Sequence, residues 1–274
     1  MHAHINWLTR GLCERYSLTQ THVPCTNHMI VVGRRRIYFG TQVDDMHLAT
    51  FLYQPVDGRF RIRPSDLDAH VAWQSNINSR LPAGSNYFIE MGHNGNGNIE
   101  WALPNDTTGK CVPPNMIEYE FPPDTPLEFQ KPLGTGTSLW PTTPATYSWS
   151  KSCVQLDDVA SWFMVPANRD AFAHVSHTFS HIGLNNATYS DTNKEIAFNK
   201  AWLRQVGLSA GRFSAAGLIP PAITGLHNGD AIKAFMDNGI KYVVGDNTRP
   251  VLRSPVSTHH LSFEWGNMVT DVVV

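Results

Sequence analysis

The sequence lacks several features that would each assign it to a class of protein. No apolar run reaches the roughly 18 residues that a membrane-spanning helix needs, so we expect no membrane span. The formal net charge is only −2, which gives no basic surface for DNA or RNA. Residues 1–7 lack the basic and apolar regions of a secretory signal, so we expect no signal peptide in this chain.

Cysteine is scarce, and its spacing argues against one kind of metal site. The four cysteines (Cys13, Cys25, Cys111 and Cys153) contain no C-x-x-C pair, so a zinc knuckle is not expected. They are either reduced and buried or joined as two bridges in one of three pairings. A bridge between Cys111 and Cys153 would tie together the proline-rich region that separates them.

The length of 274 residues is enough for one large domain. Residues 1–30 show no clear period and are interpreted as a lead-in, and residues 31–274 form the main domain. Half of the 18 prolines lie between Pro104 and Pro144, which predicts a helix-free insertion at about 98–150. Such a long segment is either a surface excursion or the wall of a substrate groove. In the second case its aromatic platforms would be Trp101, Trp140 and Trp149.

Elsewhere strand and helix patterns alternate, which predicts an α/β fold with a mainly parallel sheet. The first carboxylate pair, Asp44-Asp45, directly follows one of these strands, and Gly92–Gly97 is expected to be a flexible loop. In such sheets the loops at the carboxyl ends of the strands carry the chemistry. The expected strands lie at 36–39, 86–91, 171–175 and 240–244, and the expected helices at 65–81, 155–164, 190–206 and 228–236.

Two short clusters could together hold a divalent metal: Asp44-Asp45 and His177-Thr-Phe-Ser-His181. A catalytic zinc ion typically has three protein ligands and an open position for water. Histidines four positions apart share one face of a helical turn, which suits chelation of one ion. Alternatively, the acids form a solvated turn and the histidines are a chance pair among 13.

Neighbouring side chains diverge, so Asp44 and Asp45 can serve one site only if the strand end bends. In that case Asp45 would bind the metal and Asp44 would take a proton from water. Two other histidines, His93 and His174, are weaker candidates for a role in the site. His174 is interpreted as a strand residue that at best supports the ligands, and His93 either touches substrate from its glycine loop or has no role.

These motifs resemble those of a known superfamily. Phe39-Gly-Thr-Gln-Val-Asp44-Asp45 resembles the Asp-Asp motif of the NodB-type polysaccharide deacetylases, and His177–His181 resembles their His-(Ser/Thr)-x-x-His motif. From about Arg35 to Arg253 the chain looks most like the fungal galactosaminogalactan deacetylases. This resemblance implies a distorted (β/α) barrel, a zinc ion, a polysaccharide substrate and a secreted or cell-surface multidomain protein.

The resemblance also implies a role for each motif residue. Asp44 is the general base, and Asp45, His177 and His181 are the metal ligands. Arg212 falls where the family has an arginine that orients the base, although its surroundings differ, and Asp246 matches a fourth motif by position only. The general-acid histidine has no clean match: it is His259, His260 or a residue beyond Val274. Residues 269–274 resemble a strand that stops without a cap, so we expect a barrel truncated at its carboxyl end.

The sequence therefore predicts a metal-dependent deacetylase that removes N-acetyl groups from an N-acetylhexosamine polymer such as galactosaminogalactan. The missing acid leaves open a non-catalytic carbohydrate-binding fragment, and the metal cluster would equally suit another metal-dependent carbohydrate esterase. Asn105-Asp-Thr107 and Asn186-Ala-Thr188 are glycosylation acceptors if the chain is secreted.

Overall fold

The structure is a computed structural model of the 274-residue chain. It describes residues 40–52, 58–111, 130–245, 260–265 and 268–273. The chain divides into two units, Met1–Phe39 and Gly40–Val274, and every described residue belongs to the second. The predicted lead-in and the strand expected at 36–39 lie outside the described residues.

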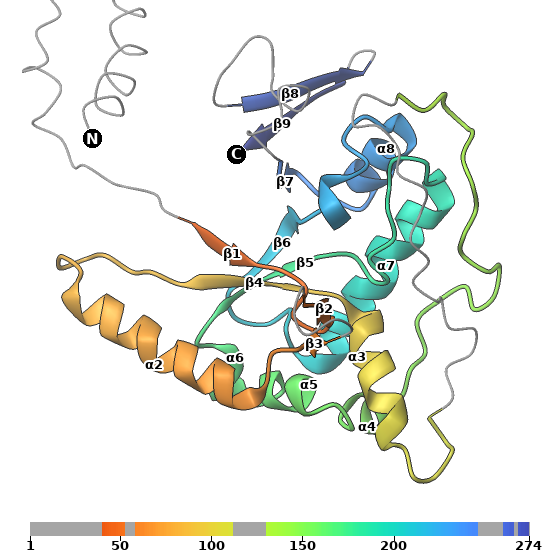
Figure 1. The fold of residues 1–274 in the computed structure, drawn as a ribbon. Helices are drawn as coiled ribbons and strands as arrows, with labels where there is room; N and C mark the ends of the chain where they lie inside the picture. The colour runs from red at the N-terminus through yellow and green to blue at the C-terminus, as the bar shows by residue number, and fades with distance from the viewer. Residues whose placement is uncertain (1–39, 53–57, 112–129, 246–259, 266–267, 274) are drawn as a thin grey trace, which may run out of the picture. The chain divides into compact units, whose positions relative to one another are not determined.

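A curled half-barrel of five parallel strands forms the centre of the second unit, in the order β1-β4-β5-β6-β7 (Figure 1). The strands are β1 (Thr41–Val43), β4 (Ile89–His93), β5 (Ala173–Ser176), β6 (Phe213–Leu218) and β7 (Tyr242–Val243). The register pairs Val43 with Met91 and His93 with Ser176, so the carboxyl ends of β1, β4 and β5 are neighbours. The predicted α/β fold of distorted (β/α) barrel type is confirmed.

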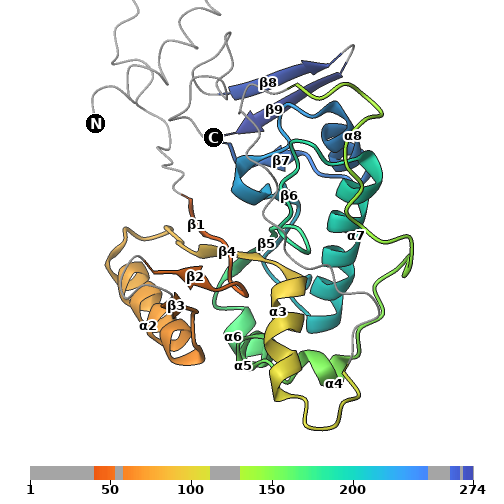
Figure 2. The ribbon, with the colours of Figure 1, turned by 45° about the vertical axis from the view of Figure 1, so that its right-hand side comes forward.

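The main helices alternate with these strands along the chain. Figures 1 and 2 show α2 near β1 and β4, and α7 and α8 near β6 and β7. Helix α7 begins after Thr188, whose hydroxyl accepts from Asp191 N, and ends at Gly207 with φ 85°, a conformation that glycine favours. The helices are α2 (Pro64–Arg80), α3 (Gly95–Ala102), α4 (Lys151–Val154), α5 (Asp158–Phe163), α6 (Pro166–Arg169), α7 (Tyr189–Val206) and α8 (Gly229–Asp237).

Shorter elements complete the described part. Within it, two antiparallel pairs form small sheets that are not hydrogen-bonded to the main sheet: β2 (Thr50–Phe51) with β3 (Arg59–Phe60), and β8 (His260–Trp265) with β9 (Met268–Val273). Two 3-10 helices span Leu103–Asn105 and Pro221–Ile223. No helix among the described residues is both long and apolar enough to cross a bilayer.

The glycine-rich segment after β4 is not the predicted flexible loop, because α3 begins at Gly95. A Cβ at Gly95 would lie 2.7 Å from Phe179 Cε2, and one at Gly97 would lie 2.7 Å from His47 O. These glycines therefore allow close packing of α3 instead of providing flexibility. The prediction of no helix after residue 98 is wrong for the same reason.

The helix expected at 155–164 is confirmed as α5, but it begins later than predicted, at Asp158. Asp157 is the N-cap of α5 and accepts from Val159 N, and the preceding short helix α4 ends at Val154. An aspartate that caps a new helix turns the chain where helical periodicity alone would continue it. The same carboxylate is part of a buried polar row described below.

The described part of the proline-rich segment, residues 130–150, packs onto α7. Trp140 and Trp149 are 7% and 6% exposed and belong to the core, which excludes for these two the alternative of sugar platforms. Trp101 is 37% exposed, and its ring lies 4.7 Å from the guanidinium carbon of Arg61. Residues 112–129 lie outside the described part.

A disulfide joins Cys111 to Cys153 and ties the two ends of this segment together. It confirms one of the bridges that the cysteine spacing allows. Cys13 and Cys25 lie outside the described residues.

Candidate metal centre

Asp44 and Asp45 follow β1 directly, and the strand end bends between them as the metal hypothesis requires. Asp45 has φ 55°, a left-handed conformation that aspartate tolerates better than most residues. The turn is closed by hydrogen bonds from Leu48 N to Asp45 O and from Met46 N to Gly92 O. A Cβ at Gly92 would lie 3.1 Å from Asp44 Cα, so the glycine in β4 lets this turn approach the sheet.

His177 and His181 lie on an irregular turn after β5, and the predicted helical turn is not formed. Thr178 and His181 have φ 63° and 58°, which no right-handed helix contains. The rings still meet, with centroids 4.7 Å apart. The side-chain amide of Asn94 donates to the carbonyls of His177 and Thr178 and so fixes the start of the turn.

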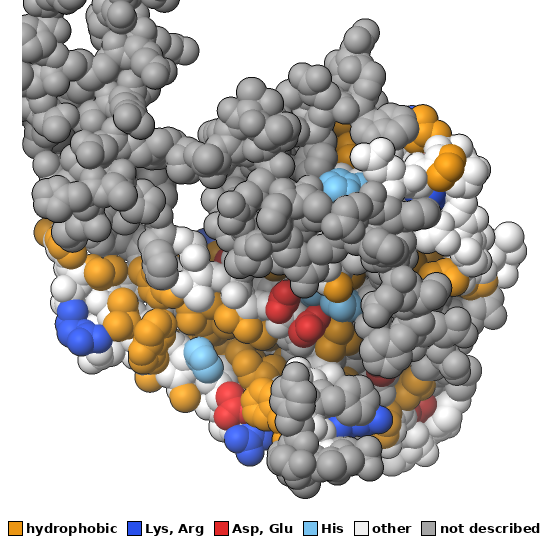
Figure 3. Space-filling model, turned by 45° about the horizontal axis from the view of Figure 1, so that its top comes forward, with side chains coloured by type: hydrophobic (Ala, Val, Ile, Leu, Met, Phe, Trp, Pro, Cys, Tyr) orange, Lys and Arg blue, Asp and Glu red, His pale blue; other side chains and the backbone are white. Residues whose placement is uncertain are grey.

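Asp45, His177 and His181 converge, and their ligand atoms all lie within 4.8 Å of one another. Asp45 Oδ1 lies 3.1 Å from His177 Nε2 and 3.4 Å from His181 Nε2. Two ligands of a tetrahedral zinc ion are separated by about 3.3 Å when each lies about 2.0–2.1 Å from the metal. Figure 3 shows acidic side chains beside a histidine near the middle of one face of the molecule.

The hydrogen bonding of His177 favours a cation in this cluster. Its Nδ1 lies 2.8 Å from the carbonyl oxygen of Ile219, which can only accept, so Nδ1 carries the proton. When the ring is neutral, Nε2 therefore presents a lone pair to the Asp45 carboxylate. Two acceptors at 3.1 Å repel each other unless a proton or a metal ion lies between them. A carbonyl that fixes the tautomer in this way is typical of metal-bound histidines.

The electrostatics of the cluster also suit a metal more than a proton. Burial and the neighbouring His177 lower the pKa of His181 to about 4, so this ring is neutral near pH 7. Burial opposes ionisation of Asp45, but the two histidines outweigh it and lower the pKa of its carboxyl group. One carboxylate and two neutral imidazoles are the ligand set of a catalytic zinc site.

Asp44 lies beside the cluster without being central to it. Its Oδ2 is 3.8 Å from His177 Nε2, and its side chain is 55% exposed. The carboxylate is therefore open to water and to a substrate. The predicted division of roles, in which Asp45 holds the metal and Asp44 removes a proton, needs such an open carboxylate and stays a prediction.

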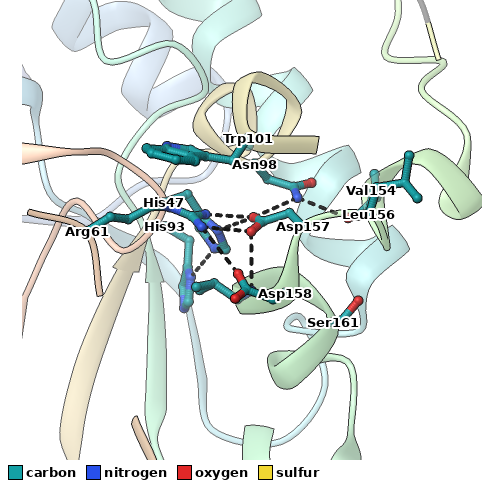
Figure 4. Close-up of polar contacts among 12 residues, drawn as sticks. His47, Arg61, His93, Asn98, Trp101, Val154, Leu156, Asp157, Asp158 and Ser161 are labelled. Carbon is teal, nitrogen blue, oxygen red and sulfur yellow. Dashed lines mark hydrogen bonds and ion pairs between the residues drawn. The ribbon is translucent and has the colours of Figure 1, made fainter. Parts of the chain in front are cut away.

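Three buried histidine rings form a row close to the cluster-bearing turns, which are the turns that carry Asp45 and His177–His181. His93 Nε2 is 3.0 Å from His174 Nδ1, and His47 Nε2 is 3.2 Å from His93 Nδ1. His174 Nε2 must donate to the carbonyl of Arg169, so His174 Nδ1 accepts from His93 Nε2, and His93 Nδ1 accepts from His47 Nε2. Figure 4 shows the other end, where Asp157 lies between His47 and the guanidinium of Arg61.

All three rings are fully buried, and burial lowers the pKa of each of them. Burial lowers the pKa of His174 to about 4. Burial raises the pKa of Asp157, but the two hydrogen bonds from Arg61, each 2.8 Å long, outweigh it and lower the pKa. His93 is therefore out of reach of a substrate. His174 can support the ligand turns through this row of rings and through strand β5, which leads to His177.

Among the other predicted site residues, Arg212 is described, and it does not lie at the cluster. Arg212 precedes β6, and its guanidinium contacts the carbonyl of Asp170 and lies 3.7 Å from the Phe88 ring centroid. The backbone carbonyl of Arg212 accepts from His174 N, three residues before His177 in β5. The backbone of Arg212 is therefore about 10 Å from that of His177, toward the opposite end of the sheet. This placement contradicts a base-orienting role for Arg212. Asp246 and His259 lie outside the described residues, and only the backbone of His260 is described.

Several residues that hold the site were not predicted from the sequence. They are the Ile219 carbonyl, Gly92, Asn94 and Glu195. Only Glu195 had a signal in the sequence, because it shares the apolar face of α7 with Phe198 and Trp202. A carboxylate on a buried face must be hydrogen-bonded, and this requirement marks it as a structural anchor.

Comparison with known proteins gives two findings. Residues 39–267 match the family model described as "Agd3 deacetylase domain". A solved structure titled "Crystal structure of Agd3 a novel carbohydrate deacetylase" is similar, with a TM-score of 0.82 and 52% sequence identity. The match covers 88% of this chain and 37% of that chain, so this sequence spans well under half of its relative. No curated protein sequence matches the chain.

Proposed function

Because the chain belongs to the Agd3 deacetylase domain family, we propose that it is a metal-dependent polysaccharide N-deacetylase. Its substrate would be an N-acetylhexosamine polymer such as galactosaminogalactan. The observation that carries the metal dependence is the approach of Asp45 Oδ1 to the two imidazoles at 3.1 and 3.4 Å. The solved relative is titled a carbohydrate deacetylase, which supports the substrate class.

In this proposal Asp45, His177 and His181 hold the metal. A divalent cation at this position would lower the pKa of water and polarise the acetyl carbonyl. Asp44, exposed beside the cluster, accepts the proton of the attacking water as general base. The overall reaction consumes water and converts the acetamide into acetate and a free amine. The acid that protonates the amine is His259, His260 or a residue of a longer chain.

Zinc is the metal that we propose, because two histidines and one carboxylate are a common zinc ligand set. The same set also accommodates cobalt, nickel or iron, so metal analysis of the purified protein must accompany activity assays. The disulfide between Cys111 and Cys153 supports the proposal that the protein is secreted or displayed at the cell surface.

Paired substitutions of adjacent acids test the assignment. Asp44→Asn should reduce acetate release from a hexosamine polymer by about 100-fold or more, while the zinc content stays near one per chain. Asp45→Asn should lose both zinc and activity, since it removes a ligand. Unchanged acetate release from Asp44→Asn would exclude Asp44 as the base.

Two comparisons separate this function from its alternatives. Faster release of acetate from O-acetylated xylan than from the N-acetylated polymer would indicate a carbohydrate esterase. Polysaccharide binding without acetate release, in the presence of added zinc, would indicate a non-catalytic carbohydrate-binding fragment. Acetate release from the N-acetylated polymer that depends on zinc supports the proposed activity.

A further inference from the structure

A fully buried carboxylate, Glu195 in α7, contacts the backbone between the two histidine ligands. Its Oε2 accepts hydrogen bonds from both Phe179 N and Ser180 N at 2.9 Å. Its Oε1 accepts from the indole Nε1 of Trp140 at 3.0 Å. Three N–H donors therefore surround this carboxylate.

The turn that Glu195 holds is one that the backbone would not adopt unaided. Thr178 and His181 are both left-handed, a conformation that is strained for residues other than glycine. Phe179 N and Ser180 N lie between these two residues, so one oxygen atom fixes the middle of the turn. Without it the turn can relax, and His181 would then move relative to Asp45.

We propose that Glu195 is a positioning residue that sets the metal affinity of the centre by fixing the turn between His177 and His181. This inference rests on the proposed function, because it assumes that the cluster binds a metal. It assigns Glu195 no contact with metal or substrate. It also gives the proline-rich segment a role, since Trp140 from that segment completes the carboxylate's hydrogen bonding.

The chain offers a matched control one helical turn earlier. Asp191 is also a fully buried carboxylate of α7 with three donors. They are Ser138 Oγ at 3.3 Å, Leu139 N at 2.8 Å and Trp140 N at 3.2 Å. Asp191 thus anchors the proline-rich segment without touching the histidine turn. Loss of either carboxylate should destabilise the fold, but Glu195 alone of the two accepts from the turn amides, so its loss should weaken zinc binding far more.

The experiment compares Glu195→Gln with Asp191→Asn in the full chain at pH 8. Zinc dissociation constants are measured by competition with a chromophoric chelator, on protein that circular dichroism shows to be folded. We expect Glu195→Gln to bind zinc about 10- to 100-fold more weakly, the range found for residues that support metal ligands. Asp191→Asn should stay within about threefold of the unsubstituted protein. Equal zinc affinities for the two variants would overturn the proposal.

A second variant protects the test against failure to fold. Glu195→Asp keeps the charge but is one methylene shorter, so it cannot hold both turn amides and the Trp140 indole at the observed distances. We expect it to weaken zinc binding as well, and unchanged affinity would overturn the inference. If the unsubstituted protein binds no zinc, the proposed function fails. If it binds zinc and both Glu195 variants bind equally well, only the role of Glu195 fails.

Discussion

The buried histidine row predicts a specific sensitivity to acid. His174 has a pKa of about 4 in the folded protein against 6.5 for an unperturbed histidine. Between these values the unfolded chain binds a proton that the folded protein excludes, so stability falls as the pH falls below 6.5. At pH 5 the loss from this one residue is about 2 kcal/mol, and at pH 7 it is near zero.

The substitution His174→Asn isolates this effect. Its carbonyl can accept from His93 and its amide can donate to the Arg169 carbonyl, so the polarity of the row is kept without a titrating group. Urea unfolding with a metal chelator present, at pH 7 and pH 5, gives the free energies of both proteins. The stability advantage of the unsubstituted protein should shrink by about 2 kcal/mol at pH 5. Parallel pH dependence of the two proteins, within about 0.5 kcal/mol, would refute the reasoning.

Two further predictions concern regions away from the cluster. The disulfide closes a loop whose ends are separated by 42 positions, so replacing Cys111 and Cys153 by serine should lower the free energy of urea unfolding by about 4 kcal/mol. A loss below about 1 kcal/mol would show that the loop is restrained by other contacts. Arg212→Ala should leave kcat/KM for deacetylation within about threefold, whereas losing a residue that positions the base costs on the order of 100-fold. A loss of that size would restore Arg212 to the active site.

The sequence predicts the ligands of the site better than their geometry. A strand that ends in two carboxylates and another that ends near two histidines place all four residues at one edge of a parallel sheet, and this prediction needs only strand order. The spacing of His177 and His181 suggested a helical turn, which is wrong because Thr178 and His181 are left-handed. No local pattern predicts that conformation, since contacts from Asn94 and Glu195, distant in sequence, impose it.

The same limit explains the error at Gly92–Gly97. Glycine is typical of both flexible loops and close packing, and local sequence does not distinguish the two. Here Phe179, more than 80 positions later, packs against Gly95 and leaves no room for a side chain. The apolar periodicity of α7 was sufficient to predict that helix because its signal lies within a single segment.

The left-handed residues of the described chain show where the fold stores strain. Apart from glycines, they are Asp45, Thr178, His181, Ala222 and Ile223. Three belong to the cluster-bearing turns, and the other two follow Ile219, whose carbonyl fixes the His177 ring. Such residues persist only where surrounding contacts over-determine them.

It follows that the fold supplies the energy that holds the ligand atoms close together before any metal binds. When the ligand atoms are ordered before binding, less of the binding free energy is needed to order the chain, and the metal affinity is higher. The buried anchors of these turns should therefore influence metal affinity more than their distance from the ion suggests. The exposed Asp44 lies outside this ordered set, and such a position suits the proposed base, which has to contact both water and substrate.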